Sequence, residues 1–168
     1  ISLNSISDLE YLDYVKNLIT YLFNVDPIIK FKKNENCVDL FVFKRKILRF
    51  LESNGLVRSP KWKRAKIPAD FLRYGICVLR GYFDTGGCVV ITNNNETIYP
   101  RLEMKVCPSP MQKQFIDILN KENFRFGVYQ IGKGQVRIQL NGKKQLELWN
   151  EKIGFKNMKH VAKVNKFL

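Results

Sequence analysis

The chain repeats one order of predicted elements, and this repeat constrains its fold more than any other feature. Apolar residues at helical spacing predict a helix over residues 8–23, capped by Ser7 or Asp8, and another over residues 109–120. The matching apolar positions are Tyr11, Val15, Leu18, Ile19 and Leu22 in the first helix, and Met111, Phe115, Ile118 and Leu119 in the second. The same pattern in two stretches of one chain predicts two copies of one unit.

Each of these helices is followed by two predicted strands and a further helix. The strands cover residues 28–32 and 38–43 in the first copy, and residues 126–131 and 135–140 in the second. The closing helices span residues 45–53 and 144–152, and they end near Gly55 and Gly154, where a left-handed cap favours glycine. This order predicts an α+β fold with antiparallel sheets, in which residues 1–66 form the first repeat and residues 67–168 the second. Chance similarity between the two stretches is the alternative.

The charge of the chain favours a polyanionic partner. Lysine and arginine outnumber aspartate and glutamate by 29 to 15, which gives a formal charge of +14. Each copy ends in a basic run without acids, namely Arg58, Lys61, Lys63, Arg64 and Lys66 after the first, and Lys156, Lys159, Lys163 and Lys166 after the second. We expect the basic residues Lys61, Lys63, Arg64, Lys159 and Lys163 to contact phosphates. An ordinary solvated surface is the alternative.

Several classes of protein and site are not expected. No stretch is apolar enough to span a membrane and no charged-then-apolar leader opens the chain, so we expect a soluble, cytoplasmic protein without a membrane partner. The four cysteines form no C-x-x-C pair and His160 is the single histidine, so free buried thiols are expected rather than a zinc site. No acid lies near His160 in the sequence, which disfavours a histidine-activated nucleophile.

Alternation along the predicted strands separates a core face from an outer face. Val136, Ile138 and Leu140 form an apolar set, as do Leu102, Met104 and Val106 on the preceding long strand. The outer residues are then Gln135, Arg137 and Gln139 on one strand, Arg101, Glu103 and Lys105 on the other, and Lys30 and Lys32 in the first copy. Arginine and glutamine match the base edges of the major groove, so we expect this face to bind nucleic acid. A merely solvated sheet face is the alternative.

Between the copies lies an apolar helix, predicted over residues 71–83, whose face carries Leu72, Ile76, Leu79 and Phe83. Gly75 is one turn from Leu79, and Gly81, a glycine inside the helix, suggests that another backbone comes close there. The helix runs into Asp84-Thr85-Gly86-Gly87 and then a strand. The stretch from Leu79 to Gly87 resembles the signature motif of the LAGLIDADG homing endonucleases, of the archaeal type. The segment from Gly154-Phe155 to Lys159-His160 resembles the usual ending of that family.

This resemblance implies a saddle of αββαββα repeats that straddles double-stranded DNA. It also implies that motif helices cross at Gly75, Leu79 and Gly81, and that Mg²⁺ between them activates water for phosphodiester hydrolysis. Gly86 stands at the eighth motif position, where the family has its metal-binding acid, so Asp84 is the one motif carboxylate left. Asp84 is a candidate metal ligand, with turn capping as its alternative role. Lys105 is the base nearest to Cys107, where the family often has a lysine.

Three functional hypotheses follow from these patterns. The first is a DNA-binding protein of the homing-endonuclease type, associated with an intron or an intein. The second is a non-catalytic derivative, such as a transcription regulator or a maturase-like RNA-splicing cofactor, with RNA as the other possible ligand. The third is a basic interaction module without a nucleic-acid role. The first copy has no counterpart of the motif, so we expect either a homodimer through the helix at residues 71–83 or a complementing N-terminal segment.

Overall fold

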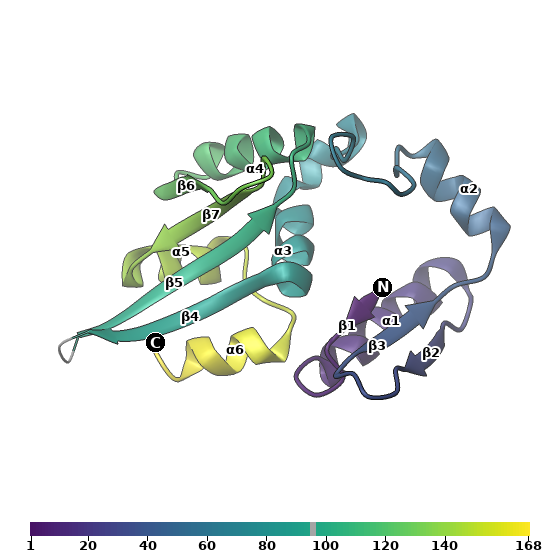
Figure 1. Ribbon diagram of the computed structural model, residues 1–168, viewed down its shortest axis with the longest axis horizontal. Coiled ribbons are helices and arrows are strands. Elements are labelled where there is room, and N and C mark those ends of the chain that lie inside the picture. Colours follow the sequence, from purple (N-terminus) through teal and green to yellow (C-terminus); the bar gives the residue numbers. More distant parts are fainter. Residues whose placement is uncertain (95–96) are drawn as a thin grey trace.

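The computed structural model describes residues 1–94 and 97–168 and shows an α+β protein with two antiparallel sheets (Figure 1). The smaller sheet has the strand order β1-β3-β2. This sheet belongs to the smaller unit of the chain, which consists of β1 (Ser2–Leu3), α1 (Leu9–Phe23), β2 (Ile28–Phe31), β3 (Val38–Phe41) and α2 (Arg45–Ser53). The predicted fold class is therefore confirmed.

The larger sheet has the strand order β4-β5-β7-β6 and is also antiparallel throughout. It belongs to the larger unit, which begins with the 3-10 helix η1 (Ala69–Tyr74) and with α3 (Gly75–Gly86), the helix that carries the motif. The remaining elements are β4 (Gly87–Asn94), β5 (Thr97–Val106), α4 (Pro110–Lys121), β6 (Phe126–Gln130), β7 (Val136–Asn141), α5 (Lys143–Lys152) and α6 (Met158–Asn165). The chain thus places its longest strands, β4 and β5, next to the motif helix.

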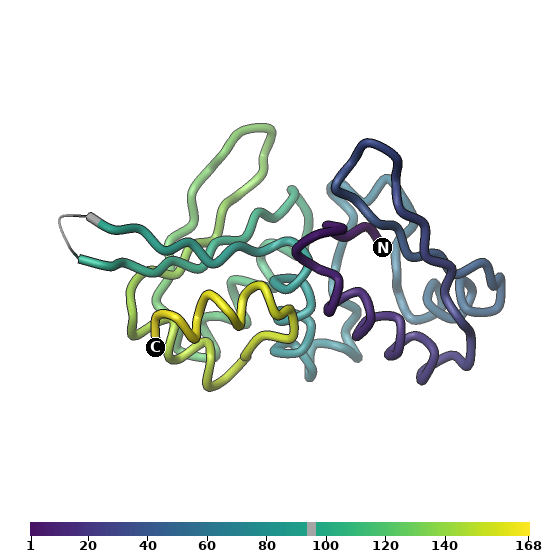
Figure 2. Tube along the Cα trace, turned by 90° about the horizontal axis from the view of Figure 1, so that it is seen from below, coloured from purple at the N-terminus to yellow at the C-terminus, as the bar shows by residue number. Residues whose placement is uncertain are grey.

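The two sheets share a neighbour order, since β1-β3-β2 in one corresponds to β5-β7-β6 in the other. The connecting loops correspond as well, because an asparagine with positive φ follows each helix, Asn24 directly after α1 and Asn123 two residues after the end of α4. Figure 2 shows that the loops joining β2 to β3 and β6 to β7 rise on the same side of the molecule, while α1 and α6 lie on the other side. The outer faces of both sheets are therefore turned the same way.

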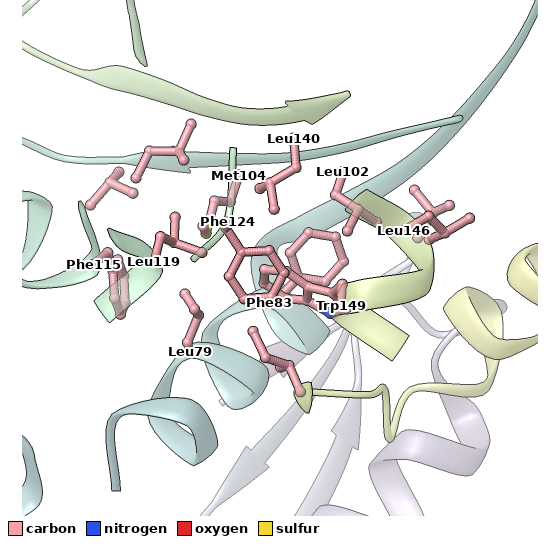
Figure 3. Packing of buried hydrophobic residues seen from close by; sticks show 14 of the residues in the cluster. Leu79, Phe83, Leu102, Met104, Phe115, Leu119, Phe124, Leu140, Leu146 and Trp149 are labelled. Carbon is pink, nitrogen blue, oxygen red and sulfur yellow. The ribbon is translucent and has the colours of Figure 1, made fainter. Parts of the chain in front are cut away.

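The core of the larger unit lies between the sheet and its helices (Figure 3). The β-strands contribute Leu102, Met104 and Leu140, as the alternation predicts. From below, Phe83 of α3 lies with its ring centroid 4.9 Å from that of Trp149 on α5. Both rings are almost completely buried, so α3 packs at the centre of this core.

The smaller unit buries far less. Its core consists of Leu3, Tyr11, Leu12, Val15, Val38 and Leu40. Leu18 and Leu22, which the helical spacing assigned to the buried face, are exposed instead, and α2 buries none of its residues. A helix that is apolar on several sides does not reveal from its sequence which side the small sheet will cover.

Three further expectations need correction. The motif helix begins at Gly75 rather than at residue 71, because residues 69–74 form a 3-10 helix in which Leu72 is exposed. The last basic run is not an open tail, since much of it forms α6. The four free cysteines are not buried thiols, because Cys77 and Cys88 are exposed and Cys37 and Cys107 are half-buried.

Candidate nucleic-acid interface

The outer face of the larger sheet carries a compact set of polar side chains. Strand pairing places Glu103 opposite Gln139, Arg101 opposite Asn141, and Lys105 opposite Arg137. The opposite face of the same strands is entirely apolar between Leu102 and Val106 on β5 and between Val136 and Leu140 on β7. Alternation therefore gathers on one face most of the outer-face residues predicted from these two strands.

Glu103 occupies the middle of this polar set. Its carboxylate lies 3.4 Å from Nε of Arg101 and 3.8 Å from a terminal nitrogen of Arg137. Next to it, the amide of Gln139 donates a hydrogen bond of 2.6 Å to the side chain of Asn141. These contacts restrict the side chains before any ligand arrives, which lowers the entropy cost of binding.

Tyr129 on β6 extends the polar set beyond the residues predicted from the sequence. The guanidinium carbon of Arg137 lies 5.9 Å from the centre of the Tyr129 ring, within the range of a cation–π contact. The ring lies over Gly127, where a Cβ atom would meet the Tyr129 hydroxyl at 2.6 Å. Gly127 is thus the residue that leaves room for Tyr129 beside Arg137.

Gln135 lies just before β7, at the end of the hairpin, and its amide contacts Sγ of Cys107 at 3.8 Å. It is therefore placed at the border of the polar face rather than among Arg137 and Gln139. Lys105 is exposed on the outer face, and its backbone carbonyl accepts a hydrogen bond from Tyr82 at 2.8 Å. The ammonium of Lys105 is thus available to a ligand of the sheet, on a different side of the strands from Asp84.

Lysines of the smaller sheet lie on the corresponding face. Lys30 is exposed and pairs in register with Asp39. Lys32 lies 3.8 Å from Asp39 and 3.6 Å from Glu35, and Asp39 raises the pKa of Lys32 above its usual value. Lys32 is thus paired with two acids, and Lys30 is the freer of the two.

The predicted phosphate contacts divide into free and engaged side chains. Lys61 and Lys63 are exposed in the linker between the two units. The guanidinium of Arg64 is engaged, because it donates to the carbonyls of Arg58 and Pro60 at 3.1 and 2.9 Å. On α6, Lys159 pairs with Asp8 at 2.8 Å and Lys163 donates to the carbonyl of Val89 at 3.1 Å. Arg64, Lys159 and Lys163 therefore stabilise the fold through contacts within the chain.

Asp84 and Gly86 do not provide a site that fits Mg²⁺. The side chain of Asp84 is only 1% exposed, and one of its oxygens accepts the backbone N–H of Lys156 at 3.0 Å. Burial raises the pKa of Asp84 although this hydrogen bond favours the charged form. Gly86 offers no side-chain ligand, and the described residues contain no group of three or more histidine, cysteine or acidic side chains that could hold a metal ion.

The three positions expected at a helix interface have different surroundings. Leu79 is fully buried in the core of its own unit, and a Cβ atom at Gly75 would meet Ile118 of α4 at 2.9 Å. Gly81 alone faces open space, with no heavy atom within 4 Å of a Cβ added there. Gly75 is therefore covered by a side chain of α4 from the same chain.

A buried polar cluster joins the two units, and the sequence patterns did not predict it. The side-chain amide of Asn157 donates to Oδ1 of Asp8 and to the carbonyl oxygen of Asp84, both at 2.9 Å. Asp8 also accepts the backbone N–H of Asn4 at 3.0 Å. Asp8 precedes a helix, so it had the appearance of a local cap; its distant partners carry no sequence pattern that identifies them.

No protein family and no curated protein matches the chain in sequence. Solved structures with partial similarity include the homing endonuclease I-CvuI in complex with the I-CreI target, with a TM-score of 0.44 and 15% identity over 56% of this chain and 66% of that one. The LAGLIDADG meganuclease I-AabMI, bound to uncleaved DNA, gives a TM-score of 0.39 and 14% identity over 46% of this chain and 28% of that one. This chain spans only part of either structure.

A membrane-crossing helix does not occur in the part of the chain that the structure describes, because none of its helices combines the required length and hydrophobicity.

Proposed function

We propose that the chain is a DNA-binding protein of the LAGLIDADG homing-endonuclease type, in which the outer face of the larger sheet lies in the major groove. The observation that carries this proposal is the polar set around Glu103 on one face of a sheet whose other face is apolar. A two-stranded ribbon fits the major groove, and arginine and glutamine pair with the edges of guanine and adenine.

The charges support a polyanionic ligand for this face. Arg101, Lys105 and Arg137 contribute cations on the larger sheet, and Lys30 contributes one on the smaller sheet, whose outer face is turned the same way. Lys61 and Lys63 of the linker remain free for phosphates. A-form RNA has a deep and narrow major groove that side chains do not reach, so double-stranded DNA suits this face better than double-stranded RNA.

The structure favours a second candidate over cleavage, namely a non-catalytic nucleic-acid-binding derivative with a regulatory or maturase-like role. The observation behind it is that the Asp84 carboxylate is buried and hydrogen-bonded to Lys156 while Gly86 has no carboxylate. Asp84 then holds the loop before α6 in place instead of binding metal. Association with an intron or intein stays a prediction.

We propose in addition that residues 1–66 and 67–168 are two copies of one repeat. Support comes from the shared strand order β1-β3-β2 and β5-β7-β6. Self-association through α3 is a further part of this proposal, with Gly81 as the point of closest approach, since its surroundings are open. A Gly81→Leu substitution is expected to abolish concentration-dependent sedimentation, whereas an unchanged sedimentation profile would contradict an interface at this residue.

Selection of bound sequences from a random duplex pool, with and without magnesium, tests the proposed function. We expect recovery of a defined sequence, binding that weakens steeply as salt is raised, and intact DNA in both conditions. Recovery of no sequence preference, together with binding that does not respond to salt, would contradict DNA recognition. Magnesium-dependent cleavage would decide against the non-catalytic candidate.

A further inference from the structure

Glu103 stands out because an acid lies at the centre of a face proposed to meet a polyanion. Its side chain is 17% exposed, whereas the two arginines beside it are exposed by 34% and 38%. A carboxylate here repels phosphate and would be unfavourable on a surface selected only for charge. The carboxylate must therefore serve something other than general attraction to DNA.

The geometry couples Glu103 to both arginines at once. Arg101 approaches one carboxylate oxygen at 3.4 Å and Arg137 approaches the other at 3.8 Å. The Nε atoms of both arginines are buried and make no hydrogen bond among the described residues, although Nε of Arg101 is in ion-pair contact with Glu103, so a ligand can reach these guanidinium groups only through their terminal nitrogens. One carboxylate thus forms ion pairs with two guanidinium groups from neighbouring strands.

We infer that Glu103 is a positioning residue that makes Arg101 and Arg137 discriminate between base sequences. This inference rests on the proposed DNA-binding function. A guanidinium held by a carboxylate keeps its donors in a fixed plane, which suits the paired acceptors of guanine, and it has less net attraction for a phosphate. Removing the charge of Glu103 would free both arginines to bind any phosphate within reach.

The direct test is Glu103→Gln, which keeps the shape of the side chain but removes its charge. Glu147→Gln is the matched control, because it changes the net charge equally on α5, where Glu147 pairs with Lys143 at 3.8 Å on the exposed surface. Each variant and the parent are titrated with the selected duplex and with a scrambled duplex, and the ratio of the two dissociation constants is the readout. Thermal unfolding of each variant confirms that it is folded.

We expect Glu103→Gln to lower this ratio about tenfold, mainly through tighter binding of the scrambled duplex. Glu147→Gln is expected to change both dissociation constants alike. Arg137→Lys serves as a second variant, since it keeps the charge but loses the planar fork, and we expect it to lower the ratio by weakening the selected duplex alone.

The inference is overturned if Glu103→Gln and Glu147→Gln give the same ratio while the parent still prefers the selected duplex. That result would leave the proposed function standing. Equal, salt-insensitive affinity of the parent for both duplexes would overturn the proposed function and this inference together. If Glu103→Gln does not fold, an unchanged ratio in Arg137→Lys is enough to overturn it.

Discussion

The Asp8 carboxylate and the Asn157 amide lie 2.9 Å apart, although 149 residues separate them in the chain. Asn157 uses both of its amide hydrogens, one for Asp8 and one for the carbonyl of Asp84, and its oxygen accepts the backbone N–H of Lys159 at 3.1 Å. All of its hydrogen-bonding groups are thus engaged in holding the smaller unit, the motif helix and α6 together.

Asn157→Ala is therefore expected to destabilise the protein by roughly 3 kcal/mol, since it removes the cap of α6 and leaves two buried acceptors with fewer partners. The free energy of unfolding in urea is the measurement. Asn165→Ala is the control, because Asn165 is exposed at the end of the same helix. A loss no larger than that of the control would show that the two units do not depend on this cluster.

The buried imidazole of His160 should make the protein sensitive to acid. Its ring lies 5.2 Å from the Phe83 ring, and burial, assisted by the charges of Lys159 and Lys163, lowers its pKa from 6.5 to about 4. The unfolded chain then takes up a proton below about pH 6.5, which the folded protein does not bind until about pH 4. The free energy of unfolding is therefore expected to decrease by roughly 2–3 kcal/mol across this interval as pH falls.

His160→Phe isolates this contribution, because it keeps an aromatic ring but cannot titrate. Unfolding of parent and variant is compared at pH 7 and pH 5. Burial raises the pKa of Asp84, which acts in the opposite direction as pH falls, but this contribution is common to both proteins and cancels in the difference. The same pH dependence in both proteins would show that His160 is not the group responsible.

Arg137→Ala should weaken binding by about 1–3 kcal/mol for duplexes that carry the preferred base at one position, and relax the preference there. The guanidinium has this role because Glu103 and Tyr129 hold it on the outer face. Lys105→Ala is expected to weaken all sequences alike and to make the salt dependence shallower. Binding profiles across a duplex library distinguish the two, and identical profiles for the Arg137 variant and the parent would remove Arg137 from the interface.

Gly127→Ala should alter recognition without harming the fold. A methyl group at this position would meet the Tyr129 ring at 2.8 Å, so the ring has to move away from its place beside Arg137. The ring is the flexible end of a half-exposed side chain, and the change in the free energy of unfolding should stay within about 1 kcal/mol. Library binding of this variant is compared with that of Val128→Ala, a change on the other face of the same strand, which should leave base preference as it is.

The unmodified chain should leave its bound DNA intact in magnesium, since Gly86 supplies no ligand and Asp84 is engaged with Lys156. Gly86→Asp has room for its side chain, because no heavy atom lies within 4 Å of a Cβ at this position. We expect this variant to fold with a stability within about 1 kcal/mol of the parent. Gel analysis shows whether the bound duplexes are cleaved. Double-strand cleavage by the unmodified chain would place the catalytic carboxylates elsewhere.

Patterns with a local cause were predictable from the sequence. The alternation of Leu102, Met104 and Val106 identified the buried face of β5, and the helix from Arg45 to Ser53 was predicted with its observed bounds. Partners distant in the chain were not predictable. Lys159 and Lys163 were predicted to contact phosphates, yet one pairs with Asp8 and the other with a backbone carbonyl of β4. A lysine looks the same in sequence whether its partner is water or a carboxylate brought close by folding.

The position of Lys163 has a consequence for aggregation between molecules of this protein. β4 forms the edge of the larger sheet, since β5 is its one partner among the described strands, and α6 lies against it with the Lys163 ammonium on the carbonyl of Val89. An uncovered border strand of this length invites strand-to-strand aggregation between molecules, and a positive charge placed there discourages it. The C-terminal helix α6 therefore protects the edge of the sheet, and chains that lose it are expected to aggregate through β4.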